Sequence, residues 1–294
     1  MKRRAFLIRT AAAVGLAGTR QRTWASAQSV EQGRLARLAR VAMMTLNFTT
    51  LLKTPGQPDS PDRTLNLFDL PAMYADTYGV HNIELQHYHV ASTEPSYFTE
   101  LRSRIDRAKS KTTQVVVEFG ALNISAADHN FLPRLQAVDL TKAWIDRAAV
   151  LACPRIMVNQ GQPTPENRAH AVDTLKAMVE YGASKGVKVT METRGGGEPA
   201  WRPLNDVAKS AGGFINVDLG GIGATSQEEL HTALKELLPS SSGSMHVSVR
   251  QNAAWDLATA LTFIESQGYK GLYSIEARGH DATRTIYNTI LETI

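Results

Sequence analysis

Short runs of apolar residues alternate with longer amphipathic stretches along residues 40–294. Aliphatic and β-branched side chains dominate the short runs, as is typical of parallel strands buried on both faces. The longer stretches carry apolar residues at helical spacing, as Ala171, Leu175 and Met178 do within Thr164–Lys185. Eight runs are predicted to be strands: Val41–Leu46, Asn82–Gln86, Gln114–Glu118, Arg155–Asn159, Lys188–Glu192, Phe214–Asp218, Met245–Val249 and Leu272–Glu276.

Eight strand–helix units in about 250 residues predict a single α/β domain, a closed (β/α)8 TIM barrel. Helix boundaries support this reading, since Ser226–Leu238 opens with the capping pair Ser226 and Glu229 and stops before Pro239. A doubly wound open sheet is the alternative. Such a sheet normally carries a glycine-rich phosphate loop after its first strand, and Val41–Thr50 contains no glycine. The barrel is therefore favoured.

Residues 1–27 have the pattern of an export signal rather than of a folded element. Lys2, Arg3 and Arg4 precede a mostly apolar stretch, and Ala25-Ser-Ala27 suits a signal peptidase. The paired arginines followed by Phe-Leu resemble a twin-arginine signal. We therefore expect a protein exported to the periplasm or secreted, with residues 28–39 as a lead-in to a barrel over residues 40–294. An ordinary secretion signal is the alternative, and the apolar stretch is too short for a stable membrane anchor.

The basic charge of the chain belongs to this segment. The whole sequence has 32 Lys and Arg against 28 Asp and Glu, and six of the basic residues lie in residues 1–27, which contain no acidic ones. The remaining chain is slightly acidic, so charge gives no reason to expect nucleic acid as a partner. Cys153 is the only cysteine, which excludes an intramolecular disulfide and a thiolate metal site.

Four potential metal ligands stand at the carboxyl ends of the last four predicted strands. They are Glu192, Asp218, His246 and Glu276, separated by 26, 28 and 30 residues, one barrel unit each. Strand ends of this kind converge at one pole of a barrel, where catalytic groups collect. Three carboxylates brought together repel one another unless a cation joins them. This donor set predicts a divalent metal site, with Mn²⁺ or Mg²⁺ favoured and Co²⁺ or Zn²⁺ as alternatives.

The flanks of these residues resemble the xylose-isomerase-like TIM barrels, a superfamily of sugar isomerases, sugar epimerases and endonuclease-IV-type enzymes. The matching phrases include Val-Thr-Met-Glu192, Asn-Val-Asp218, Met-His246-Val and Gly268-Tyr-Lys-Gly-Leu-Tyr-Ser-Ile-Glu276. The resemblance implies that Glu192 and Glu276 are both metal ligands and proton-transfer groups. It also assigns Asp218 and His246 as ligands. The specific motifs lie in the second half of the chain only.

The sequence also departs from the family. Gly221 stands where many members place a histidine three residues after the ligand aspartate, and the seventh-strand phrase here is His-Val-Ser-Val-Arg250. Histidines on the second strand could take the lost role. Alternation places Glu84 and Gln86 on one face of that strand, and His87 and His89 are expected in the loop beyond it. The candidates for substrate binding are His87, His89, Glu118, Gln160, Arg250 and Trp255.

The expected activity is metal-dependent isomerisation or epimerisation of a small carbohydrate, with proton abstraction next to a carbonyl through an enediolate. A lyase or hydratase acting on 3-keto-glycosides would use the same residues and is the first alternative. A non-catalytic sugar-binding barrel is the second. A phosphodiesterase of endonuclease-IV type is disfavoured because Gly221 removes one of its ligands. The sequence leaves the sugar, the native metal and the oligomeric state open.

Overall fold

The computed structural model describes residues 28–119, 125–158, 161–194, 200–249 and 253–294. The chain divides into two units, residues 1–39 and Arg40–Ile294. Of the first unit the structure describes a helix over residues 28–38. The predicted export signal, residues 1–27, lies outside the described residues. Within the described residues no helix is long and apolar enough to cross a membrane.

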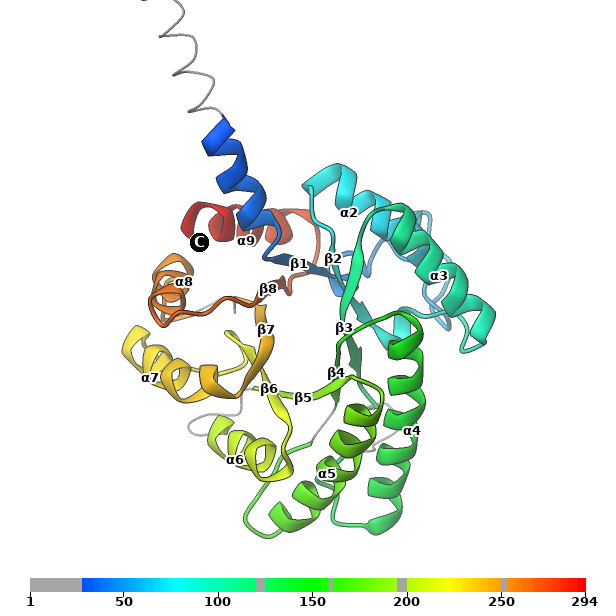
Figure 1. Ribbon diagram of the computed structural model, residues 1–294, viewed down its shortest axis with the longest axis vertical. Helices are drawn as coiled ribbons and strands as arrows, with labels where there is room; N and C mark the ends of the chain where they lie inside the picture. Colours follow the sequence, from blue (N-terminus) through cyan, green and yellow to red (C-terminus); the bar gives the residue numbers. More distant parts are fainter. Residues whose placement is uncertain (1–27, 120–124, 159–160, 195–199, 250–252) are drawn as a thin grey trace, which may run out of the picture. The chain divides into compact units, whose positions relative to one another are not determined.

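The second unit is a closed barrel of eight parallel strands in the order β1 to β8, which confirms the predicted TIM barrel. Each strand pairs with its neighbours in sequence, and β8 pairs with β1 to close the ring. Figure 1 shows the helices arranged around this ring of strands. The strands are β1 Val41–Met44, β2 Asn82–Gln86, β3 Lys111–Val117, β4 Arg155–Val158, β5 Lys188–Glu192, β6 Phe214–Asp218, β7 Ser241–Val247 and β8 Leu272–Ile275.

A helix follows each strand, with apolar side chains turned toward the barrel. In α7 the predicted N-cap is confirmed, since the Ser226 hydroxyl accepts the Glu229 N–H at 3.1 Å. The Glu229 carboxylate turns back to Thr225 rather than to Ser226, accepting that residue's N–H at 2.7 Å. The helices are α2 Leu70–Tyr78, α3 Pro95–Arg107, α4 Phe131–Val150, α5 Arg168–Ser184, α6 Trp201–Ala211, α7 Gln227–Leu237, α8 Leu257–Ser266 and α9 His280–Thr293.

Some strand boundaries differ from the prediction, and the difference has a physical cause. The first strand stops at Met44, because Thr45–Phe48 forms a 3-10 turn at the top of β1. The seventh strand begins at Ser241, well before the predicted Met245. Its first residues are Ser-Ser-Gly-Ser, which no apolar pattern identifies as a strand, yet they form ladder contacts with β6 and β8.

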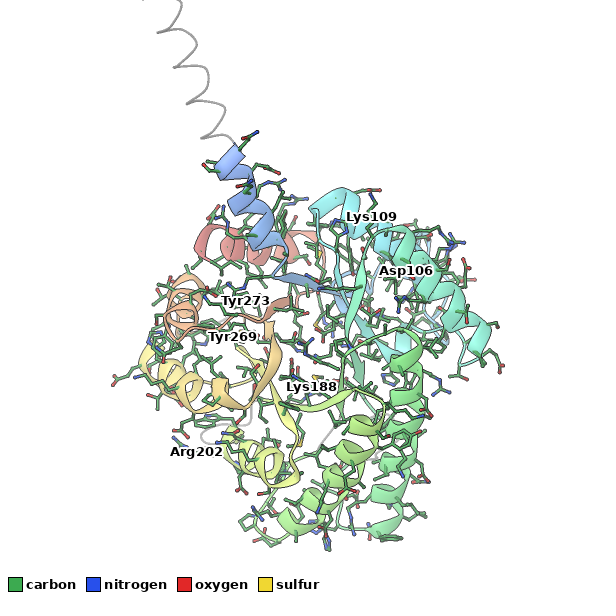
Figure 2. The ribbon with its side chains drawn as sticks, in the orientation of Figure 1. Asp106, Lys109, Lys188, Arg202, Tyr269 and Tyr273 are labelled. Carbon is green, nitrogen blue, oxygen red and sulfur yellow. The ribbon has the colours of Figure 1, made fainter. Side chains whose placement is uncertain are left out.

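The closure between β1 and β8 is reinforced by a partly buried ion pair. Arg40 donates to both carboxylate oxygens of Glu265, at 2.9 and 2.7 Å, and the Tyr273 hydroxyl donates to the same carboxylate. The Tyr273 ring lies 5.4 Å from the Tyr269 ring (Figure 2). Bidentate arginine–carboxylate pairs combine charge with fixed geometry. The contact therefore fixes the register of the last strand against the first.

The interior of the barrel contains buried polar side chains as well as an apolar cluster. Contacts that cross it, such as Gln114 of β3 to Asn216 of β6 at 3.3 Å, identify the inward positions. Strand alternation then turns Glu192, Asn216 and His246 inward with them. A buried apolar cluster belongs to the first four units: Met44, Leu46, Val116 and Met157. The polar groups of the candidate site come mainly from β5 to β8.

Candidate metal centre

Four strand ends place the expected ligands at one level of the barrel. Glu192 and Asp218 are the last residues of β5 and β6, His246 lies near the end of β7, and Glu276 follows β8. The pairing register sets Asp218 beside His246. The Glu276 N–H donates to the carbonyl of Val247 at 3.1 Å, which continues the ladder past the end of β8. The parallel topology thus brings these residues to one pole.

Three of them converge closely. Glu192, His246 and Glu276 each offer a ligand atom, and these atoms lie within 4.8 Å of one another. Nδ1 of His246 lies 2.6 Å from Oε1 of Glu192 and 3.1 Å from Oε2 of Glu276. Glu192 and His246 are buried, and Glu276 is half-buried. Among the described residues, these three form the cluster able to hold a metal ion.

The electrostatics of the cluster show an excess of buried negative charge. Burial, with repulsion from Glu276 and Asp218, raises the pKa of Glu192 to about 8. Burial and repulsion from Glu276 raise the pKa of Asp218 to about 7. Burial alone would lower the pKa of His246, but the carboxylates of Glu84, Glu192 and Glu276 raise it well above its usual value. Protons therefore occupy this site when no other cation does.

A divalent cation fits this donor set. Two carboxylates and one imidazole nitrogen are ligands that Mn²⁺, Mg²⁺, Co²⁺ and Zn²⁺ all accept. Oε2 of Glu276 is buried and faces the cluster, since it lies 3.1 Å from Nδ1 of His246. An ion there would lower the pKa values of Glu192 and Asp218 by offsetting the mutual repulsion of the carboxylates.

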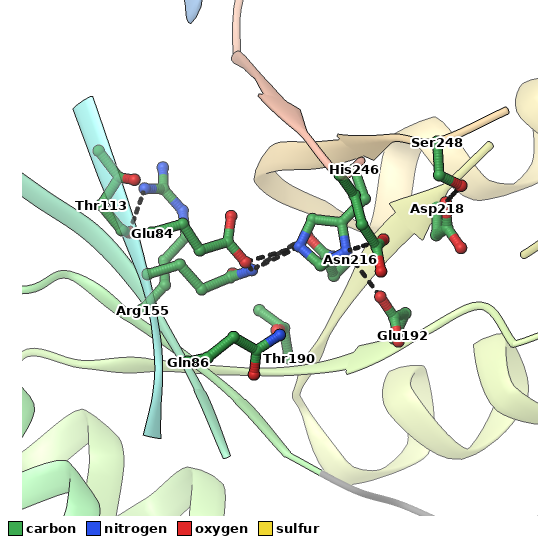
Figure 3. A network of polar contacts seen from close by, with 12 residues as sticks. Glu84, Gln86, Thr113, Arg155, Thr190, Glu192, Asn216, Asp218, His246 and Ser248 are labelled. Atoms are coloured by element: carbon green, nitrogen blue, oxygen red, sulfur yellow. Dashed lines mark hydrogen bonds and ion pairs between the residues drawn. The ribbon is translucent and has the colours of Figure 1, made fainter. Parts of the chain in front are cut away.

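Asp218, the fourth expected ligand, is held apart from the other three. Its Oδ1 accepts hydrogen bonds from the Ser248 hydroxyl and, at 3.2 Å, from the Gly220 N–H. The close-up in Figure 3 shows Ser248 beside this carboxylate. Repulsion from Glu276 still reaches Asp218 and raises its pKa. The structure thus brings three of the expected ligands together, and metal ligation by all four residues stays a prediction.

The missing histidine at position 221 has a structural explanation. A Cβ on Gly221 would lie 1.9 Å from the carbonyl oxygen of Thr193 and 2.4 Å from Oδ2 of Asp218. Both are closer than any side chain tolerates. The turn after β6 therefore requires glycine, and a histidine there needs a different path of the backbone.

An arginine that the sequence analysis did not single out reaches the cluster from the β5 loop. Nε of Arg194 donates to Oε2 of Glu192 at 2.6 Å, and its Nη2 contacts Oε1 of Glu118. Glu118, a predicted substrate residue, is thus tied to a predicted ligand through one guanidinium. Arg194 could have been predicted from the sequence, because it stands two residues after Glu192 and so on the same side of an extended chain.

His87 and His89 lie in a 3-10 turn after β2, as expected. Nδ1 of His87 accepts the Glu118 N–H at 3.2 Å, and its ring packs edge-on against Trp144. The two nitrogens of His89 face the hydroxyls of Thr45 and Thr49, at 2.8 and 3.2 Å. Burial lowers the pKa of each to about 4, so both rings are neutral near pH 7. Their contact with substrate stays a prediction.

The remaining candidates are less closely defined. Gln160 and Arg250 lie outside the described residues, and Trp255 is half-buried in the loop before α8. Tyr88, which was not predicted, is close enough to Glu276 for that carboxylate to help raise its pKa, after burial. A tyrosine between two histidines in a loop gives little sequence signal.

No family model and no curated protein matches the sequence. Many solved structures match the fold. They include xylose-isomerase-like TIM barrels, to which this chain is similar in fold. A xylose isomerase-like TIM barrel protein from Mycobacterium smegmatis, in complex with magnesium, matches with a TM-score of 0.61 and 12% identity, over 88% of this chain and 98% of that one.

Two further neighbours differ in activity. The 3-keto-D-glucoside 4-epimerase from E. coli matches with a TM-score of 0.64 and 13% identity, over 87% of this chain and 99% of that one. An AP endonuclease of family 2 from Brucella melitensis matches with a TM-score of 0.64 and 12% identity, over 84% of this chain and 96% of that one. At such identities the likeness shows the fold, and the activity must be argued from the site.

Proposed function

We propose that this protein is a divalent-metal-dependent sugar isomerase or epimerase. The observation that carries the proposal is the convergence of Glu192, His246 and Glu276 at the carboxyl pole of the barrel. Solved neighbours of the same fold include several sugar epimerases, such as an L-ribulose 3-epimerase and a D-tagatose 3-epimerase-like protein. They support a small carbohydrate as the substrate.

The three residues would hold the metal, with Asp218 completing the set from the β6 end. Bound there, the ion supplies a Lewis acid that offsets negative charge developing on a substrate oxygen. The side chain of Glu276 is 26% exposed, against 6% for Glu192, so Glu276 is the more accessible of the two carboxylates at the carboxyl pole. It is placed to take a proton from the substrate carbon.

A lyase acting on 3-keto-glycosides is the second candidate, and the Arg194 contact favours it. Oε2 of Glu192 is held by that guanidinium while Oε1 faces His246. Both oxygens of Glu192 are thus engaged, so this carboxylate is less free to approach a substrate proton. One free base suffices to remove a proton before a β-substituent departs, whereas exchange of protons on opposite faces calls for two groups. The 3-keto-D-glucoside named for one neighbour belongs to the same substrate class.

The proposed substrate shell comprises His87, His89, Glu118 and Trp255, together with Gln160 and Arg250, which lie outside the described residues. Export through the twin-arginine route, using Arg3 and Arg4, is part of the same proposal and would place the reaction in the periplasm or outside the cell.

The decisive experiment is proton exchange in deuterated water. Chelator-treated protein is reloaded with Mn²⁺, Mg²⁺, Co²⁺ or Zn²⁺ and incubated with free sugars and 3-keto-glycosides. Deuterium in an isomeric sugar supports the isomerase, and a released aglycone supports the lyase. Glu276→Gln serves as the control for exchange by free metal. A sugar that binds without any exchange under every metal would leave only the sugar-binding barrel.

A further inference from the structure

Each nitrogen of the His246 imidazole contacts a carboxylate. Nδ1 faces Glu192, and Nε2 lies 2.6 Å from Oε1 of Glu84, a residue of β2 on the far side of the barrel. Figure 3 shows Glu84 and Glu192 approaching the ring from opposite directions. Both Glu84 and His246 have side chains that are 0% exposed. Glu84 is not one of the three residues that form the metal cluster.

Glu84 is held in place by its own partners. Nε2 of Gln114 donates to the same oxygen of Glu84 at 2.9 Å, and lies 3.3 Å from Oδ1 of Asn216. A fully buried carboxylate is costly unless it is paired and hydrogen-bonded. Oε1 of Glu84 therefore has two described partners, Gln114 and His246, and the second connects it to the metal cluster.

The chemistry of the two groups determines which nitrogen can bind a metal. An ionised carboxylate only accepts hydrogen bonds, so the nitrogen facing Glu84 must carry its proton. The other nitrogen of a neutral imidazole then has the free lone pair. In metalloproteins a carboxylate on the remote nitrogen fixes the ring of a ligand histidine in this way.

We propose that Glu84 is the positioning residue of the metal centre: it holds Nε2–H of His246 and presents the lone pair of Nδ1 to the ion. The inference rests on the proposed metal site. Glu84 of β2 thereby has a function at the metal centre, although it is not a member of the cluster.

The first test is metal affinity measured by calorimetry on Glu84→Gln. The amide keeps the size of the side chain but loses its charge and can donate instead of accept. We expect Mn²⁺ to bind about 10- to 100-fold more weakly, as for other carboxylates behind ligand histidines. Asn82→Ala is the matched control. Asn82 lies on the same face of β2 and donates to the carbonyl of Val41 at 2.7 Å, so its loss should lower stability but leave metal affinity unchanged.

Equal affinity in Glu84→Gln and the unaltered protein would overturn the positioning role. Equal losses in Glu84→Gln and Asn82→Ala would also overturn it, since they would reflect general destabilisation. If the unaltered protein binds no metal, the proposed function itself fails, and the two failures are thus distinguishable.

A second measurement needs no variant. In the Zn²⁺-loaded protein with ¹⁵N-labelled histidine, nuclear magnetic resonance distinguishes the metal-bound nitrogen of His246 from the protonated one. We expect Nδ1 to bind the ion and Nε2 to carry a proton. Coordination through Nε2 would contradict the inference even if Glu84→Gln fails to fold.

Discussion

At the scale of single residues, the candidate site is defined by what surrounds each ligand. Glu192 contacts His246 on one side and Arg194 on the other, and Asp218 contacts Ser248. The sequence could predict that Glu192, His246 and Glu276 lie together, because strand ends carry them at a regular spacing. It could not predict the contact of Ser248 with Asp218, since these two residues belong to different units and meet through the register of β6 and β7. Arg194, two residues after Glu192, could have been found.

Replacing Glu192 tests the cluster directly. We expect Glu192→Gln to lower kcat by about 100-fold or more and to weaken metal binding, because it removes one ligand charge from the three-residue cluster. Turnover on the sugar found by deuterium exchange and calorimetry with Mn²⁺ measure the two effects. Glu118→Gln, which loses only a contact to Arg194, should keep its metal. Near-normal activity and affinity in Glu192→Gln would remove the basis for the site.

Gly221 gives a second test at this scale. The added methyl group of Gly221→Ala would meet the Thr193 carbonyl and the Asp218 carboxylate, so the turn must shift. We expect a loss of about 1–3 kcal/mol in the free energy of unfolding, as for other overpacked sites. Gly33→Ala is the control, because its new Cβ would lie 3.7 Å from the nearest atom, Nη1 of Arg37. An unchanged midpoint of urea unfolding in Gly221→Ala would show that the turn tolerates a side chain.

At the scale of elements, periodicity predicted the number and order of strands but not all of their limits. The short apolar runs predicted the first and last residues of β2, β5 and β6 correctly. They missed the start of β7 because the residues there, Ser-Ser-Gly-Ser, carry no apolar side chain by which a strand could be recognised. Their pairing with β6 and β8 comes from the backbone, which the pattern of side chains does not report.

The start of α7 provides a prediction on an element. The Ser226 hydroxyl accepts the Glu229 N–H, and without it that N–H loses its partner at the helix end. We expect Ser226→Ala to lower the free energy of unfolding by about 1 kcal/mol. Ser226→Asp keeps an accepting oxygen and should retain most of the stability. Thermal unfolding of the three proteins compares them, and equal stability of the alanine variant would mean that the Glu229–Thr225 contact alone suffices.

At the scale of the whole molecule, the buried charge makes the stability of the metal-free protein depend on pH. Unfolded carboxyls ionise near pH 4, whereas folded Glu192 and Asp218 keep their protons to about pH 8 and 7. The unfolded chain thus binds fewer protons in this range. His246 acts in the same direction above pH 6.5, because its pKa is raised in the folded state.

We therefore expect the free energy of unfolding, measured in chelator, to fall as the pH rises from about 5 to about 8. Saturating Mn²⁺ should reduce or reverse this fall, because the ligands are then ionised when folded. The double variant Glu192→Gln with Asp218→Asn should show a shallower dependence. Stability in chelator that rises over the same range would contradict the raised pKa values.

Export is also a property of the whole chain. Changing Arg3 and Arg4 to lysine keeps the charge but removes the paired guanidinium signal, so we expect the protein to remain in the cytoplasm. Cell fractionation followed by detection of the protein measures this. Continued export of the lysine variant would instead indicate the general secretion route.

The pairing of β8 with β1 has a consequence for the timing of metal acquisition. Synthesis proceeds from the amino end, and the three clustered ligands all belong to the last four strands, with Glu276 emerging after β8. At the proposed metal site, an ion can therefore be bound only after the chain has been synthesised through Glu276, however much of the barrel has already formed. Metal uptake during synthesis would then report that β8 has joined β7.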